Sequence, residues 1–218
     1  MMRKDLTLAL AVLLVTGPVL AGCNGNFSLA EAPNEVQSPT PPVEPPDQNA
    51  KTDLRLVRDG VGFGLGESID EMYQVFGNPK TSFEFSDLPP GFGPPYSAKG
   101  WETAREGVGA ILYDNKVVAV MRQLTRATNE QLSQLVDTTR QENLPAQPQV
   151  IQGARVVYYF WDKSPQRIMI SGLNTRNDAW HITEALGDDK VMDAIGASPT
   201  KAAADKATVD SKLSSAKG

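Results

Sequence analysis

The sequence predicts an α+β fold, in which helix–hairpin units build one antiparallel sheet and the helices cover one face of it. Two helix-capping patterns and one tight-turn pair, Asp114-Asn115, predict these elements. A third observation is an internal similarity. Residues 111–132 and 159–181 both read as strand, turn, strand, Thr-Arg and helix, which indicates a tandem repeat.

The first helix is predicted to begin after Ser68. Ser68 and Glu71 have the spacing of a capping box, in which each side chain bonds the backbone amide of the other. The apolar residues that follow recur at helical spacing, and Gly77 and Pro79 then end the helix.

Two further helical segments are predicted. Thr128 and Gln131 repeat the capping pattern ahead of a helix that ends before Pro145. Asp178 is expected to cap a third helix that carries Ile182, Ala185 and Leu186 and breaks at Gly187. Asp188 and Asp189 are then expected to cap a short last turn, because carboxylates favour a helix N-terminus.

Hairpins are predicted between the helices. Strands at 110–113 and 116–123 flank Asp114-Asn115, two residues that tolerate the positive φ of a tight turn. Strands at 156–161 and 166–173 flank residues 162–165 in the same way. These hairpins are expected to pair into one sheet.

The first 22 residues have the anatomy of a signal peptide. Arg3 and Lys4 precede an apolar run that is too short to span a bilayer as a helix. The sequence Leu20-Ala21-Gly22-Cys23 then resembles the lipobox of bacterial lipoproteins. This resemblance implies cleavage before Cys23 and a membrane anchor of lipid, palmitate included, on that residue. An ordinary signal with a chance cysteine is the alternative.

The rest of the chain divides by composition. Residues 23–52 are rich in proline and poor in aliphatic residues, which predicts a lipidated cysteine followed by a disordered stalk. Recognition of these prolines by a partner is the alternative. Residues 53–196 are long enough for a single α+β domain. Residues 197–218 are rich in Ala, Ser, Lys and Asp, and we expect a disordered tail there, with a docking helix as the alternative.

Composition argues against several kinds of site. The formal net charge is −5, so nucleic acid is not an expected partner. One cysteine and one histidine, His181, cannot build a typical zinc site. The glycine run at 60–66 leads into an acidic helix start, which would repel phosphate. We therefore expect no cofactor, no metal and no catalytic residues.

The order of motifs from residue 64 to residue 123 resembles the SmpA/OmlA-like domain of outer-membrane assembly lipoproteins. The similarity is carried by Gly66-Glu67-Ser68, by Phe76-Gly77-Asn78-Pro79 and by residues 111–118. It implies a helix–hairpin fold and a scaffold role in outer-membrane assembly or integrity. Related tandem domains occur in secreted inhibitory proteins. The matching motifs are helix ends and turns, so the resemblance transfers no catalytic residue.

One loop is a candidate partner-binding site. Residues 86–101 are rich in Pro and Gly and carry three aromatic residues, Phe92, Tyr96 and Trp101. Aromatic side chains often dominate binding energy at interfaces. The alternative is that they pack back onto the sheet. We expect Trp101 to behave as a core residue and Phe92 as a surface residue.

These observations favour a lipid-anchored, non-enzymatic binding or scaffold protein of the bacterial cell envelope. Its expected partners are the membrane, through Cys23, and an envelope protein. Asn24 after the cysteine favours the periplasmic face of the outer membrane, by resemblance to enterobacterial sorting rules. The alternatives are a hydrolase that uses carboxylates with His181, and a protein inhibitor that acts through residues 86–101.

Overall fold

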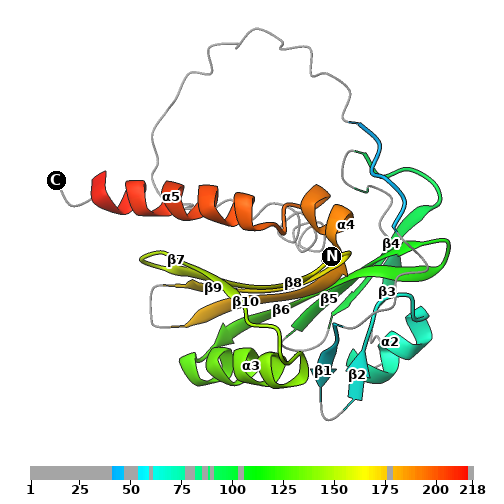
Figure 1. Cartoon of the computed structure of the whole chain (residues 1–218), viewed down its shortest axis with the longest axis horizontal. Helices are drawn as coiled ribbons and strands as arrows, with labels where there is room; N and C mark the ends of the chain where they lie inside the picture. Colours follow the sequence, from blue (N-terminus) through cyan, green and yellow to red (C-terminus); the bar gives the residue numbers. More distant parts are fainter. Residues whose placement is uncertain are drawn as a thin grey trace, which may run out of the picture.

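An eight-stranded antiparallel sheet forms the centre of the protein (Figure 1). The computed structural model describes residues 41–46, 54–58, 61–76, 82–84, 88, 91–102, 106–175 and 179–215. The strand order is β3-β4-β5-β6-β10-β9-β8-β7. The bounds in that order are Ser82–Glu84, Tyr96–Glu102, Glu106–Tyr113, Lys116–Ala127, Trp180–Asp188, Gln166–Asn174, Val156–Lys163 and Gln149–Gln152.

The chain builds this sheet in two similar halves. Helix α2 (Ile69–Phe76) precedes strands β3 to β6, and helix α3 (Asn129–Glu142) precedes strands β7 to β10. Each half runs from one edge of the sheet to its centre, where β6 pairs with β10. The predicted α+β class with an antiparallel sheet is confirmed, and the repeated unit is a helix followed by four strands.

Both predicted capping boxes are present. Ser68 accepts from the amide of Glu71 at 3.3 Å, and the Glu71 carboxylate accepts from the amide of Ser68 at 2.7 Å. Thr128 and Gln131 form the same pair of bonds at the start of α3. Each box satisfies two amides that the first helical turn leaves without a partner.

Replacing Thr128 by alanine removes one of these bonds, and we expect it to lower the free energy of unfolding by about 1 kcal/mol. Urea denaturation measures the change. Ser133→Ala, at an exposed position in the middle of α3, is the matched control and should change stability by less than about 0.5 kcal/mol. Equal effects of the two substitutions would contradict the role of the cap.

The predicted tight turn is also confirmed. Asp114 and Asn115 have φ values of 50° and 63°, and they join β5 to β6. Both residues tolerate the left-handed region better than most, so the turn fits the right-handed twist of the hairpin.

The predicted third helix is wrong. Ile182, Ala185 and Leu186 lie in strand β10. This strand lies between β6 and β9, and all its residues from Ile182 to Asp188 are buried. Because both faces are covered, the strand lacks the polar–apolar alternation that would have identified it. Asp188 does cap the short helix α4 (Asp189–Ala194), as expected, by accepting from the amide of Lys190 at 3.0 Å.

Helices cover both faces of the sheet, so the expectation of one covered face is wrong. Helices α2 and α3 lie below the sheet in Figure 1, together with the small β1–β2 hairpin (Leu56–Arg58 and Val61–Phe63). Helices α4 and α5 (Pro199–Ser215) lie above it. The buried side chains accordingly form one cluster that includes Leu132 of α3 and Ile168, and two others that include residues of α4, one with Met192 and one with Val191.

Helix α5 replaces the disordered tail that composition predicted. Ala202 is buried against the sheet, and the amide of Ala154 donates to the Asp210 carboxylate at 3.0 Å. Gly153 allows the close approach, because a Cβ there would lie 3.0 Å from Lys206 and 3.1 Å from Asp210. Tertiary contacts of this kind stabilise a helix that would be only marginally stable in isolation.

A buried ion pair crosses the centre of the sheet. Arg122 of β6 and Glu184 of β10 are direct cross-strand neighbours and are 7% and 2% exposed. The Nε of Arg122 donates to Oε2 of Glu184 at 2.8 Å, and its Nη2 donates to the same oxygen. Ile182 and Leu186 lie two residues on either side of Glu184, so their side chains share one face of β10, the face that α3 covers.

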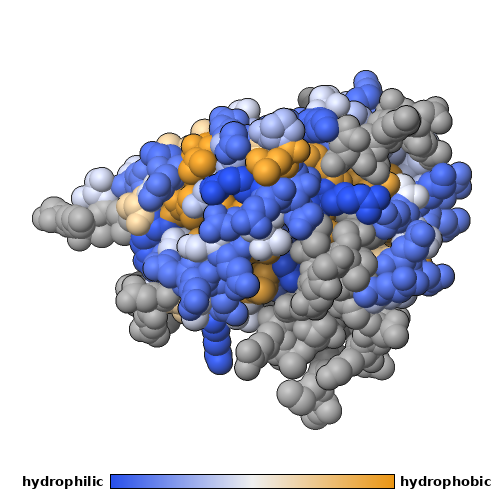
Figure 2. Space-filling model, turned by 60° about the horizontal axis from the view of Figure 1, so that its bottom comes forward, coloured by the Kyte–Doolittle hydropathy of each residue, from blue (hydrophilic) through white to orange (hydrophobic). Residues whose placement is uncertain are grey.

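The outer surface on the α3 side is mixed in polarity. Figure 2 shows apolar residues between larger areas of polar ones on this side of the molecule. Leu144, Val150 and Leu173 are the exposed large apolar residues among those described. Within the described ranges, no helix has both the length and the apolar character that crossing a bilayer requires.

Candidate binding site at the docked proline segment

Residues 41–46, which we call the strap, lie against the folded body beside β4 (Figure 1). Their sequence is Pro-Pro-Val-Glu-Pro-Pro. The amide of Val43 donates to the carbonyl of Gly91 at 2.8 Å, and the hydroxyl of Tyr96 donates to the carbonyl of Glu44 at 2.9 Å. The expectation that residues 23–52 form a disordered stalk is therefore wrong for these six residues.

Aromatic side chains pack under the strap. Tyr96 begins β4 and pairs with Tyr113 at the end of β5, which places their ring centroids 4.8 Å apart. Phe92 packs edge-on against Tyr96 at 5.1 Å. Burial, with a smaller effect of Asp188, raises the pKa of Tyr96 to about 12. The Tyr96 hydroxyl therefore remains a hydrogen-bond donor at all physiological pH values.

An apolar cluster completes the floor of the site. Val43 packs against buried side chains that come from β4, β6 and α4, namely Tyr96, Val118, Ala119 and Val191. Helix α4 reaches this position because Gly187 leaves room for it. A Cβ at Gly187 would lie 2.7 Å from Met192 and 3.0 Å from Ala119.

A lysine on α4 supplies the charge of the site. The ammonium of Lys190 forms an ion pair with the Glu44 carboxylate. The hydrogen bond and charge of Lys190 hold the pKa of Glu44 below its usual value. Both side chains are more than half exposed, so the pair contributes little to stability.

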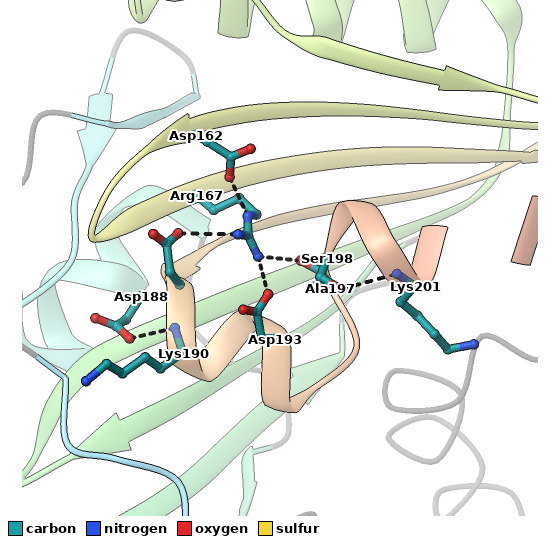
Figure 3. Close-up of polar contacts among 9 residues, drawn as sticks. Asp162, Arg167, Asp188, Lys190, Asp193, Ala197, Ser198 and Lys201 are labelled. Atoms are coloured by element: carbon teal, nitrogen blue, oxygen red, sulfur yellow. Dashed lines mark hydrogen bonds and ion pairs between the residues drawn. The ribbon is translucent and has the colours of Figure 1, made fainter. Parts of the chain in front are cut away.

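Arg167 of β9 fixes the position of α4 (Figure 3). Its guanidinium pairs with Asp162 of β8, with Asp193 of α4 at 2.6 Å and with Asp189 of α4 at 3.8 Å. It also donates to the carbonyl of Ala197 at 3.4 Å, just after the helix. These contacts hold both ends of α4 on the sheet, and Lys190 with them.

The structure brings two of the three predicted loop aromatics together. Tyr96 is 9% exposed and bonded to the strap, so it is a core residue while the strap is docked. Phe92, expected on the surface, is half-buried and packs against the core. Trp101 lies further along β4, opposite Val108, and its side chain is outside the described residues. Cys23 also lies outside them.

Sequence reasoning missed the partners of these aromatics. Val43 and Lys190 lie far apart in the sequence, and no local pattern links them to Tyr96. The proline cluster was the one available signal, and it was interpreted as a spacer.

His181 is the histidine of the alternative hydrolase hypothesis. It is exposed on β10, where the sequence predicted a helix. Within the described part of the chain no residue forms a hydrogen bond with its imidazole ring. In that same part, no group of three or more acidic, histidine or cysteine side chains is placed to hold a metal ion.

The chain matches no protein-family model and no curated protein. Among solved structures it is similar to a cysteine-rich secretory protein from Staphylococcus aureus subsp. aureus Mu50, with 8% sequence identity and a TM-score of 0.34. The similarity covers 64% of this chain and 48% of that one. A likeness this partial carries no argument about fold or function.

Proposed function

We propose that the protein is a lipid-anchored, non-enzymatic binding or scaffold protein of the bacterial cell envelope. One observation carries the proposal. The single cysteine of the chain occupies the last position of Leu20-Ala21-Gly22-Cys23, after a basic start and a short apolar run. Each buried methylene contributes about 0.8 kcal/mol, so two or three acyl chains on Cys23 would hold the protein on a membrane stably.

The strap limits how far such an anchor lets the body move. From Cys23 to Pro41 there are 41 − 23 = 18 residue steps. At no more than about 3.6 Å per residue for a fully extended chain, the reach is at most about 65 Å. A tether that stayed free up to residue 53 would reach about 110 Å at the same distance per residue. The body would therefore lie close to its membrane, with the strap side nearest the tether.

The anchor hypothesis is tested by Cys23→Ala. We expect the variant to lose lipid labelling by a radioactive or clickable palmitate and to move from the detergent phase to the aqueous phase. Slow processing or a retained signal segment should accompany the loss. Ser28→Ala, five residues downstream, is the matched control and should behave as wild type. Detergent partitioning of Cys23→Ala equal to that of wild type would overturn the proposal.

Partner capture addresses the binding role. Affinity capture from solubilised envelopes, with identification by mass spectrometry, should recover an envelope protein linked to outer-membrane assembly or integrity. Repeated capture of no protein and no peptidoglycan would count against a scaffold role. Loss of a cellular phenotype in His181→Ala, with the protein still folded, would instead favour the hydrolase.

A further inference from the structure

We infer that the surface beneath the strap is a receptor for proline-rich acidic segments of other proteins, and that the strap is its built-in competitor. We define the strap-binding surface as the carbonyl of Gly91, the hydroxyl of Tyr96, the ammonium of Lys190 and the apolar cluster around Val191. The inference specifies the binding role proposed above and does not depend on the lipid at Cys23.

The contacts are those that recognise an extended proline-rich chain. Prolines fix φ near −65° and favour polyproline II, which leaves backbone carbonyls available to a partner. Tyr96 donates to such a carbonyl, and aromatic side chains with a free donor are the usual readers of this conformation. Val43 supplies the single strap amide used, and it bonds to Gly91. Gly91 has φ +96°, a conformation that glycine adopts without strain.

The surface also specifies a side-chain pattern. The apolar cluster contacts Val43, and Lys190 pairs with the next residue, Glu44. Pro46 is buried, whereas Pro41, Pro42 and Pro45 are exposed. The expected ligand therefore has an apolar residue followed by an acidic one, with prolines on both sides.

The strap is well suited to exchange with such a ligand. It belongs to no strand or helix, and two hydrogen bonds to its backbone, one exposed ion pair, the packing of Val43 and the burial of Pro46 hold it. Binding of a tethered segment is intramolecular, with effective concentrations in the millimolar range. The tethered strap can therefore occupy the surface even though each of its contacts is weak. A partner segment that makes the same contacts can still displace it.

The test measures binding of a fluorescent peptide with the sequence of residues 40–47 to the full mature protein in mild detergent. The key variant has residues 41–46 replaced by glycine and serine. We expect saturable binding to it, and apparent binding at least about fivefold weaker to wild type, because the strap competes. A peptide with serine in place of the valine and the glutamate should not bind.

Point variants locate the binding. In the strap-replaced chain, Tyr96→Phe should raise the Kd of the peptide about three- to tenfold, the range expected for the loss of one neutral hydrogen bond. Tyr158→Phe is the control, because Tyr158 is half-buried in the Phe160 cluster above the sheet and its replacement should leave binding unchanged. If the strap-replaced chain does not fold, Val43→Asp combined with Glu44→Lys expels the strap with two substitutions and takes its place.

Three results would overturn the inference. One is no peptide binding by a folded strap-free variant, and another is binding that Tyr96→Phe leaves unchanged. The third is a wild-type dimer that forms with concentration and is lost in Tyr96→Phe, since the occupant would then be the strap of a second copy. Cys23→Ala protein measured in parallel should bind the peptide normally, so failure here and failure of the lipid anchor are distinguishable.

Discussion

Replacing Glu184 by alanine should lower the free energy of unfolding by about 3–5 kcal/mol. Arg122 is 7% exposed and lies on a sheet face packed with apolar side chains. Without Glu184 its guanidinium loses the carboxylate that accepts from both its Nε and its Nη2. A charge left in a medium of low polarity costs far more than the pair contributes when it is intact.

Two controls make this expectation specific. Arg122→Met combined with Glu184→Leu removes both charges, and we expect the double variant to be much more stable than Glu184→Ala. Asp137→Ala breaks the exposed pair with Arg140 on α3 and should cost less than about 1 kcal/mol. Chemical denaturation of the three variants gives the comparison. A loss in Glu184→Ala as small as that in Asp137→Ala would show that the buried charge is relieved in another way.

Replacing Trp161 by alanine is expected to cost about 3–5 kcal/mol, the range for removing a large aromatic side chain from a core. Trp161 lies in β8 opposite Ile168, is fully buried, and stacks with Tyr159 at a centroid distance of 6.4 Å. The substitution leaves a cavity in the cluster that joins the sheet to α3. Thermal and urea unfolding should both detect the loss.

Trp161→Phe separates packing from hydrogen bonding. The indole Nε1 is buried, and no described residue accepts a hydrogen bond from it. Removing such a donor recovers part of its desolvation cost, about 1–3 kcal/mol, and offsets some of the lost packing. We therefore expect Trp161→Phe to be clearly milder than Trp161→Ala. Leu173→Ala, at a side chain 38% exposed, should have a small effect. Equal losses in the two Trp161 variants would rule out this account.

The elements that sequence predicted correctly are those that local chemistry determines. The capping boxes at Ser68 and Thr128 and the turn at Asp114-Asn115 each depend on residues at most three apart. Strand β10 was missed because elements distant in sequence bury it on both faces. Its own sequence therefore lacks the alternation of polar and apolar residues that predicts a strand. Helix α5 was expected only as the alternative to a disordered tail, because contacts with Gly153 and Ala154, some fifty residues earlier, stabilise it.

The same limit applies to the candidate site. Composition drew attention to Phe92 and Tyr96, and the structure places them together. Their relation to Glu44 and Lys190 arises only when the sheet brings β4 beside α4, across 146 residues of sequence in the case of that ion pair. A proline-rich segment has no internal hydrogen bonds, so its sequence does not reveal whether it is free or docked.

The order of strands has a consequence for how the chain reaches its native state. Within each half, every pair of adjacent strands is also consecutive in sequence, so these pairings close short loops. The β6–β10 seam is the exception, because the whole second half separates its two strands. When the chain emerges N-terminus first, β6, at 12 residues the longest strand described, is an open edge until β10 arrives. Unpaired edges recruit other chains, so this interval is when the chain is most exposed to aggregation.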